Sequence, residues 1–194
     1  MADESDSVWI NTHLIGDRYR VTIAFDKDHW VYLDREEGLS YASAVLSAAT
    51  AAEYDAAIFA QMRTRLGVRD EAIAEVVRLF RERRPPVRRP LASTSWGHGK
   101  KARNNPTDVM ELVPGVSAYN GKAFLLVKIK DKEVGQWTVE DAREHASWVL
   151  ESVTVAEYDT AYFGLLLAEL LGTGEEGRAS QIVAEIEDFR EGVR

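Results

Sequence analysis

Apolar and polar residues alternate in two well-separated stretches of the chain. One apolar set is Tyr19, Val21, Ile23 and Phe25, and the other is Ala123, Leu125, Val127 and Ile129. A period of two places each set on one face of an extended segment and predicts a half-buried β-strand. Further strands are expected over residues 8–14, before the first set, and over 29–33 and 133–137, after each set.

Turn residues indicate that these strands form hairpins. Gly16-Asp17 separates the first two strands, and a glycine at the first central position suits a type II′ turn. Asn120-Gly121 holds the corresponding place before residue 123 and is a strong short-range hairpin signal.

The pattern then changes to a helical period. Asp34 and Thr138 stand where helix N-caps are expected, and Glu37 and Asp141 follow three residues later. One apolar stripe comprises Leu39, Ala42, Val45, Leu46 and Ala49, and the other comprises Val139, Ala142, Ala146, Val149, Leu150 and Val153. This spacing predicts an amphipathic helix after each group of strands.

Two further Thr-x-x-Glu boxes, at Thr50–Glu53 and Thr154–Glu157, predict that a second helix begins there and runs to about Leu66 and Leu171. A third helix is expected in each half. Its apolar residues would be Ile73, Val76, Val77 and Phe80 in the first half, and Ile182, Ile186 and Phe189 in the second.

The two halves resemble each other at an offset of 104 residues. Residues 33–59 align with 137–163 without a gap, and twelve of the 27 aligned positions are identical. We therefore expect an α+β fold that arose by internal duplication of a β-β-β-α-α-α unit, with the two halves packed as a pseudo-dimer. The expected domains are 1–84 and 107–194. Residues 85–106, rich in proline and glycine, would form a basic linker without regular structure.

Composition narrows the class of protein. The chain is 45% hydrophobic and can bury a core. It has no cysteine, which excludes disulfides, zinc–thiolate sites and cysteine nucleophiles. The acidic N-terminus lacks a signal-peptide pattern, and no apolar run reaches the length of a membrane span. We therefore expect a soluble, cytoplasmic protein with no membrane partner. Seventeen arginines against seven lysines suggest a GC-rich bacterial or phage gene.

Positive charge is concentrated between Arg78 and Arg103. This segment carries a net charge of +8, although the whole chain carries −8. It could contact nucleic acid or another anionic ligand through phosphate contacts and aromatic stacking. The candidate residues are Arg83, Arg84, Arg88, Arg89, Trp96, His98, Lys100, Lys101 and Arg103. A solvated charge run, or one packed on the acidic body, is the structural alternative.

No spacing of residues indicates catalysis, a metal site or a cofactor. The repeated Glu-Tyr-Asp triplets at 53–55 and 157–159 suit helix capping, with the tyrosines as core anchors, better than acid–base chemistry. The four histidines lack ligand spacing, and no phosphate-binding glycine motif or nucleophile elbow occurs.

A duplicated module without catalytic motifs favours binding. The first hypothesis is a non-enzymatic interaction protein that recognises a protein partner. The alternative is a nucleic-acid-binding or regulatory protein that uses residues 78–103, and an enzyme ranks third. The run 162–168 is apolar around its whole helix, which predicts burial or, second, contact with another chain such as a homodimer partner.

Overall fold

A computed structural model describes residues 8–15, 18–25, 30–83, 87–90, 93–94, 104–105, 109–117, 119–129, 131–171 and 181–182. The fold is α+β, as predicted. Its strands are β1 (Trp9–Ile15), β2 (Arg18–Ala24), β3 (Trp30–Leu33), β4 (Val87–Pro90), β5 (Ser93–Thr94), β6 (Asn104–Asn105), β7 (Val109–Val116), β8 (Ala123–Ile129) and β9 (Lys132–Thr138). The helices are α1 (Arg35–Arg65), α2 (Asp70–Arg83) and α3 (Val139–Leu171).

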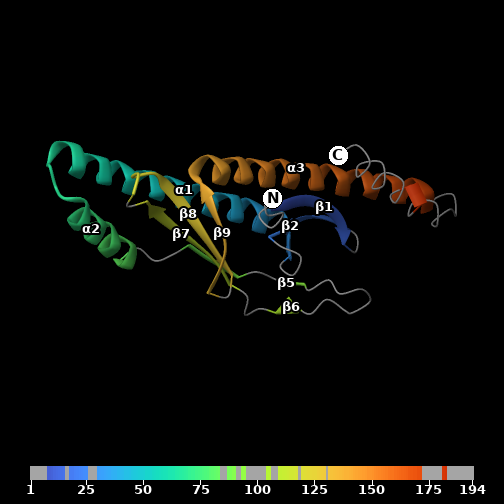
Figure 1. The fold of residues 1–194 in the computed structure, drawn as a ribbon. Coiled ribbons are helices and arrows are strands. Elements are labelled where there is room, and N and C mark those ends of the chain that lie inside the picture. Colours follow the sequence, from blue (N-terminus) through green and yellow to red (C-terminus); the bar gives the residue numbers. More distant parts are fainter. Residues whose placement is uncertain are drawn as a thin grey trace, which may run out of the picture.

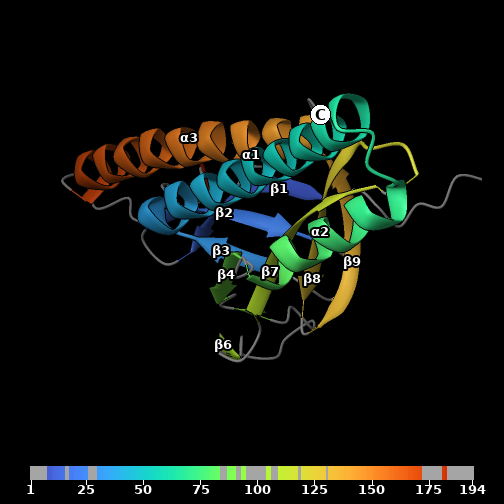
Figure 2. The same ribbon diagram turned by 90° about the vertical axis from the view of Figure 1, so that its left-hand side faces the viewer.

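The strands form two antiparallel sheets. One has the order β1-β2-β3-β5-β6, and the other has the order β4-β7-β8-β9. Three consecutive strands followed by a long helix therefore occur twice along the chain: β1, β2 and β3 before α1, and β7, β8 and β9 before α3. Both long helices lie on the same side of the two sheets, as Figures 1 and 2 show.

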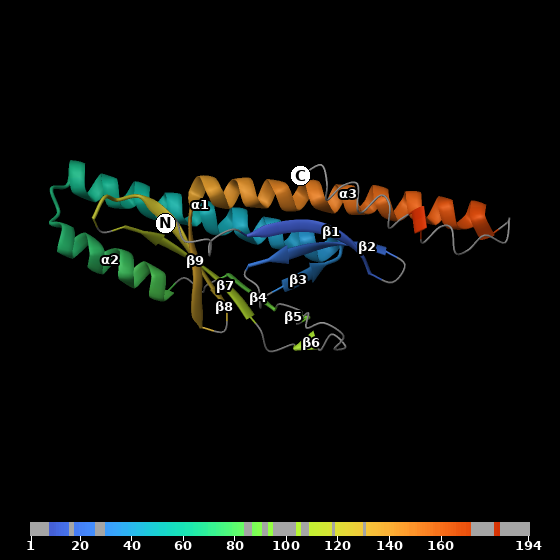
Figure 3. The ribbon, with the colours of Figure 1, turned by 45° about the vertical axis from the view of Figure 1, so that its right-hand side comes forward.

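α1 and α3 run antiparallel and lie side by side over their N-terminal parts, whereas their C-terminal parts extend in opposite directions (Figure 3). Their buried side chains and those of the two sheets form one core. All four alternating residues predicted on β2, from Tyr19 to Phe25, are buried, and so are Leu125, Val127 and Ile129 on β8. The core between the helices is built largely from alanine and valine, which allows the two helix backbones to approach closely.

The predicted N-caps at Asp34 and Thr138 are confirmed. Asp34 Oδ1 accepts a hydrogen bond from the Glu37 amide, and Glu37 Oε2 accepts one from the Asp34 amide. Thr138 and Asp141 make the same reciprocal pair of bonds at the start of α3. The strand-to-helix junction is thus made in the same way in both halves.

The prediction of two further capping boxes, at Thr50 and Thr154, is wrong. Thr50 and Thr154 lie inside the uninterrupted helices α1 and α3. Their hydroxyls donate to the carbonyls of Leu46 and Leu150, one turn earlier in the same helix. With its hydroxyl bonded inside the helix, each threonine no longer competes with the backbone, and the alanine-rich surroundings of Thr50 have a high helix propensity. Each predicted pair of helices is therefore one helix.

The predicted third helix of the first half is α2 (Asp70–Arg83). Ile73 and Val77 are buried in a small cluster with Phe59 of α1 and Val116 of β7. Of the corresponding segment of the second half, only residues 181–182 are described, and they are helical. Ile186 and Phe189 lie outside the described residues.

The stretch 85–106 contains three short strands. β4 pairs with β7, whereas β5 pairs with β3 in the other sheet and with β6. The expectation of a connection without regular structure is wrong for these residues, because their backbones extend existing sheets. The domain limits at residues 84 and 107 stay a prediction.

Both predicted hairpins are present. β1 and β2 are joined at the pair Ile15–Arg18, and the Gly16-Asp17 turn itself lies outside the described residues. β7 and β8 are joined by a wider loop, in which the Ser117 amide donates to the Lys122 carbonyl. Gly121 has a φ of +69°, a left-handed conformation that glycine adopts without strain.

Candidate functional site

The outward side of α1 carries an apolar groove, here called the α1 groove. Its volume is about 810 Å³. Its lining residues are Leu39, Ser43, Leu46, Ser47, Thr50, Ala51, Tyr54 and Ile58 of α1, with Leu150 of α3. Small residues form the floor, and large apolar side chains stand at intervals of about two turns.

Two leucines that line the α1 groove contradict the predicted core stripe. Leu39 and Leu46 were assigned to the core stripe, but both are exposed, while Ala42, Val45 and Ala49 are buried. The same residue period fits both results, because the helix turns Ala42, Val45 and Ala49 into the core and leaves the two leucines exposed beside them.

The repeated tyrosines were expected to anchor the core. Instead, Tyr54 is 66% exposed and Tyr158 is 74% exposed. Within the same triplets, Asp55 is buried, whereas Asp159 is half-buried. The core-anchor interpretation of the tyrosines is therefore wrong, and both rings lie on the outer surface of the helix pair.

Charge distinguishes the α1 groove from the corresponding face of α3. No residue from Ser40 to Ala52 is charged, and none of the described residues that line the groove is charged. At an offset of 104, Leu39 corresponds to Arg143 and Ser47 to Glu151, so charges interrupt the α3 face. Surface helices are normally polar on their exposed side, and an uncharged face is typical of the centre of an interface.

The repeated glutamates bridge the two helices. Glu53 Oε2 accepts a hydrogen bond from Arg143 at 2.5 Å, and Glu157 Oε1 lies 2.6 Å from Arg35 Nε. Both glutamates were expected to complete capping boxes at the N-termini of new helices, and that expectation is wrong. Instead, each of these partly exposed ion pairs joins α1 to α3.

A second candidate site lies between β9 and α3. Here a cavity of about 450 Å³ is lined by Val8, Phe25, Val134, Gly135, Gln136, Trp137, Asp141, His145 and Trp148. His145 is 4% exposed, and its Nε2 lies 2.8 Å from Tyr41 Oη. The Trp137 ring packs on the imidazole with a centroid separation of 4.5 Å.

Burial controls the ionisation of this pair. Desolvation lowers the pKa of His145 from 6.5 to about 4, so the imidazole is neutral at pH 7. Desolvation also raises the pKa of Tyr41 well above its ordinary value, which keeps the phenol protonated. The hydrogen bond therefore joins two neutral groups in the core.

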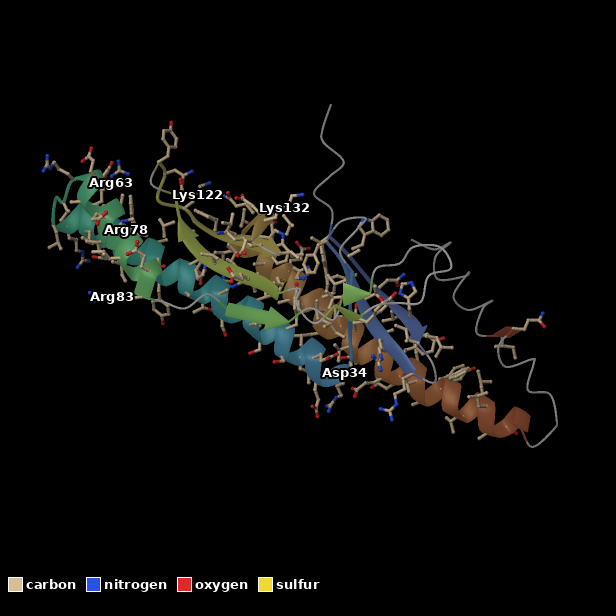
Figure 4. All side chains as sticks on the ribbon, turned by 90° about the horizontal axis from the view of Figure 1, so that it is seen from below. Asp34, Arg63, Arg78, Arg83, Lys122 and Lys132 are labelled. Carbon is tan, nitrogen blue, oxygen red and sulfur yellow. The ribbon has the colours of Figure 1, made fainter. Side chains whose placement is uncertain are left out.

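Only three of the nine residues predicted to contact an anionic ligand lie among the described residues. Arg83 ends α2 and is exposed, and Figure 4 shows it on the same side of the molecule as Arg63 and Arg78. Arg88 and Arg89 lie on β4, where their backbones pair with Glu111 and Met110. The remaining candidates lie outside the described residues: Arg84, Trp96, His98, Lys100, Lys101 and Arg103.

Arg78 begins the basic segment, but its charge is balanced locally. It pairs with Glu75 at 2.5 Å and also with Glu82, both on α2. These ion pairs at i,i+3 and i,i+4 occupy the guanidinium and favour a solvated helix surface at this point. The anionic-ligand interpretation of residues 83–103 stays a prediction.

The apolar run 162–168 is not buried on all sides. Phe163 is buried, but Tyr162 and Leu165 are exposed. Burial around the whole helix was therefore a wrong expectation for this run. Within the described ranges, no helix is long and apolar enough to cross a membrane. The same ranges contain no cluster of three or more histidine, aspartate or glutamate side chains that could hold a metal ion.

Comparison of the chain with protein-family models, with curated proteins and with solved structures found no match.

Proposed function

We propose that this chain is a non-enzymatic binding protein that recognises an amphipathic helix of a protein partner in the α1 groove. The observation that carries the proposal is the absence of charge along an exposed, apolar face of a surface helix. Helix-in-groove recognition uses apolar anchors spaced by helical turns, and the spacing of Leu39, Leu46 and Tyr54 provides matching positions.

The dimensions favour a helical occupant. Leu39 and Ile58 are 19 positions apart, which corresponds to about 28 Å of helix at 1.5 Å per residue. The floor of Ser43, Ser47 and Ala51 repeats every four residues, so it provides the groove between ridges into which a second helix packs. A partner helix of about five turns would cover this face.

Charge favours a partner that is basic beside its apolar face. Glu36 and Glu37 are exposed at the end of α1 where the groove begins. The chain as a whole carries −8. Acidic residues beside an apolar groove attract a basic partner and set its orientation.

Site-directed photo-crosslinking tests the proposal. The chain has no cysteine, so Ser43→Cys introduces a single attachment point for a benzophenone maleimide inside the groove. Ser147→Cys is the matched control, because Ser147 is the exposed residue of α3 that corresponds to Ser43. Each labelled protein is irradiated in host-cell extract, and the adducts are mapped by mass spectrometry.

A heterologous adduct at residue 43 that is absent at 147 and maps to a helical segment supports the proposal. Adding Leu46→Glu should abolish this adduct, because a charge in the groove would lose its water without a partner. Identical adducts at both positions would contradict it. An adduct with a second copy of this chain would show instead that the groove is a homodimer interface.

We also infer that the two halves arose by duplication and pack about a pseudo-twofold axis. The repeated order of three strands and a helix supports this inference, as does the meeting of Tyr41 with His145, which are 104 positions apart. Corresponding residues meet at such an axis. The corresponding residues Glu53 and Glu157 each make an ion pair between the two helices, with Arg143 and Arg35 respectively. A crystal structure in which β2, β3 and α1 fail to superpose on β8, β9 and α3 would contradict the inference.

A further inference from the structure

The cavity between β9 and α3, here called the tryptophan cavity, has the features of a ligand site. Asp141, His145 and Trp148 follow one another at i, i+4 and i+7, so they share one face of α3. Gly135 and Trp137 lie two apart on β9 and face the same side. Its volume of about 450 Å³ is within the range of small-molecule pockets.

Glycine leaves part of this space open. A Cβ added at Gly135 would lie 3.7 Å from Trp137 Nε1, so the indole lies over the glycine in ordinary contact distance. The other face of the site is formed by Trp148, which is about half exposed, and by the buried Phe25. A ligand entering here would therefore meet two indoles and a phenyl ring.

The polar groups of the cavity indicate the charge of its ligand. Among the described residues that line the cavity, Asp141 is the only one with a formal charge at pH 7, and none is a lysine or arginine. Aromatic faces also attract cations. His145 is 96% buried, and among the described residues no hydrogen bond engages its Nδ1, since Nε2 is the nitrogen that meets Tyr41. The imidazole is neutral at pH 7, so it places no positive charge beside a bound cation.

We propose that the tryptophan cavity binds a small protonated amine that carries an apolar or aromatic group. The apolar group would pack between Trp137, Trp148 and Phe25. The ammonium would be attracted by the Asp141 carboxylate and by the faces of the indole rings. This site uses β9 and α3, and it is independent of the partner proposed for the α1 groove.

Titration followed by the indole N–H resonances of 15N-labelled protein tests the site. The chain has five tryptophans, and Trp137→Phe and Trp148→Phe assign the two relevant signals. The probe is 2-phenylethylamine at pH 7.5, where it is protonated, and 2-phenylethanol is its neutral counterpart. We expect saturable shifts of the Trp137 and Trp148 signals with the amine, and binding at least tenfold weaker with the alcohol.

Charge variants then test the role of the carboxylate. Asp141→Asn should weaken amine binding by at least fivefold. Glu144→Gln removes an equal charge from an exposed residue of α3 outside the cavity, and it should leave the dissociation constant within twofold. If Asp141→Asn fails to fold, the comparison of the amine with the alcohol on the native protein still tests whether the cavity prefers a cation.

Three results would overturn the proposal: no saturable shift, equal binding of the alcohol, or shifts spread over all five indoles. Nα-acetyl-lysine methylamide distinguishes the source of the amine. Tighter binding of this derivative than of 2-phenylethylamine would identify the natural ligand as a protein side chain, and weaker binding would identify it as a free amine.

Discussion

Tyr41 of α1 and His145 of α3 share a buried hydrogen bond of 2.8 Å, and 104 positions separate them in the chain. Their rings meet edge to face with centroids 5.6 Å apart. The two residues are also corresponding members of the two similar halves. The bond therefore joins the halves at equivalent positions, in the layer where the two long helices pack against each other.

We expect Tyr41→Phe to destabilise the fold by about 1–3 kcal/mol. The substitution leaves the His145 Nε2 atom buried without its partner, and an unpaired buried polar group costs about that amount. Urea denaturation followed by circular dichroism measures the change. Tyr54→Phe is the control, because that hydroxyl is on an exposed residue, and its effect should stay within about 0.5 kcal/mol. Equal effects of the two variants would show that the buried bond contributes nothing.

The same histidine should make the stability depend on pH. Its folded pKa is about 4, below the 6.5 of an exposed histidine, so only the unfolded chain binds a proton between these values. Stability should therefore fall as the pH decreases from 6.5 to 4, by about 1.4 kcal/mol per pH unit from this group. Above pH 6.5 the group is neutral in both states and contributes no slope.

Removing the titrating group tests this slope. The double variant Tyr41→Phe, His145→Leu leaves no unpaired partner behind, and its stability should change less steeply between pH 6.5 and 4 than that of the native chain. A double variant with the native slope would assign the pH dependence to other groups.

We expect opposite effects on stability when alanine replaces a threonine at a helix cap and when it replaces a threonine inside a helix. Thr138→Ala should cost about 1 kcal/mol, because it removes the acceptor of the Asp141 amide at the start of α3, and Asp34→Ala should cost a similar amount. Thr50→Ala and Thr154→Ala replace residues inside helices by the best helix former, and they should be neutral or stabilising by up to about 0.5 kcal/mol. The denaturation midpoints of the four variants measure these changes. A large loss of stability in Thr50→Ala would contradict a helix that continues through this residue.

The sequence predicts the strands and the true caps well. Alternation from Tyr19 to Phe25 identifies β2 because one face of that strand is buried, and Asp34 identifies a helix start because the chain leaves a strand just before it. The Thr-x-x-Glu pattern at Thr50 is misleading. The same residues occur inside a helix when the threonine hydroxyl bonds to the preceding turn, so the motif alone cannot distinguish the two cases.

The candidate sites could be predicted less well. The exposure of Leu39 and Leu46 depends on which side of α1 faces the sheets, and an apolar period does not give that side when both sides carry apolar residues. The tryptophan cavity combines β9 with a face of α3 and with Phe25 from the other half. Residues 110 positions or more apart in the chain meet there, and no local pattern contains that information.

Gly38 of α1 packs directly against Val153 of α3. A Cβ added at Gly38 would overlap Val153 Cγ2, and Val153 is itself buried. A β-branched side chain has little rotamer freedom in a helix, so valine cannot turn away and the helices must separate. We expect Gly38→Ala to destabilise the fold by about 1–3 kcal/mol, the usual cost of overpacking. Val153→Ala in the same chain should restore part of the loss by removing the clashing methyl group.

Gly164→Ala is the matched control, because a Cβ there meets no atom within 4 Å and alanine favours the helix by up to about 1 kcal/mol. If Gly38→Ala and Gly164→Ala shift the thermal midpoint alike, the helices do not approach at Gly38 as the structure has them.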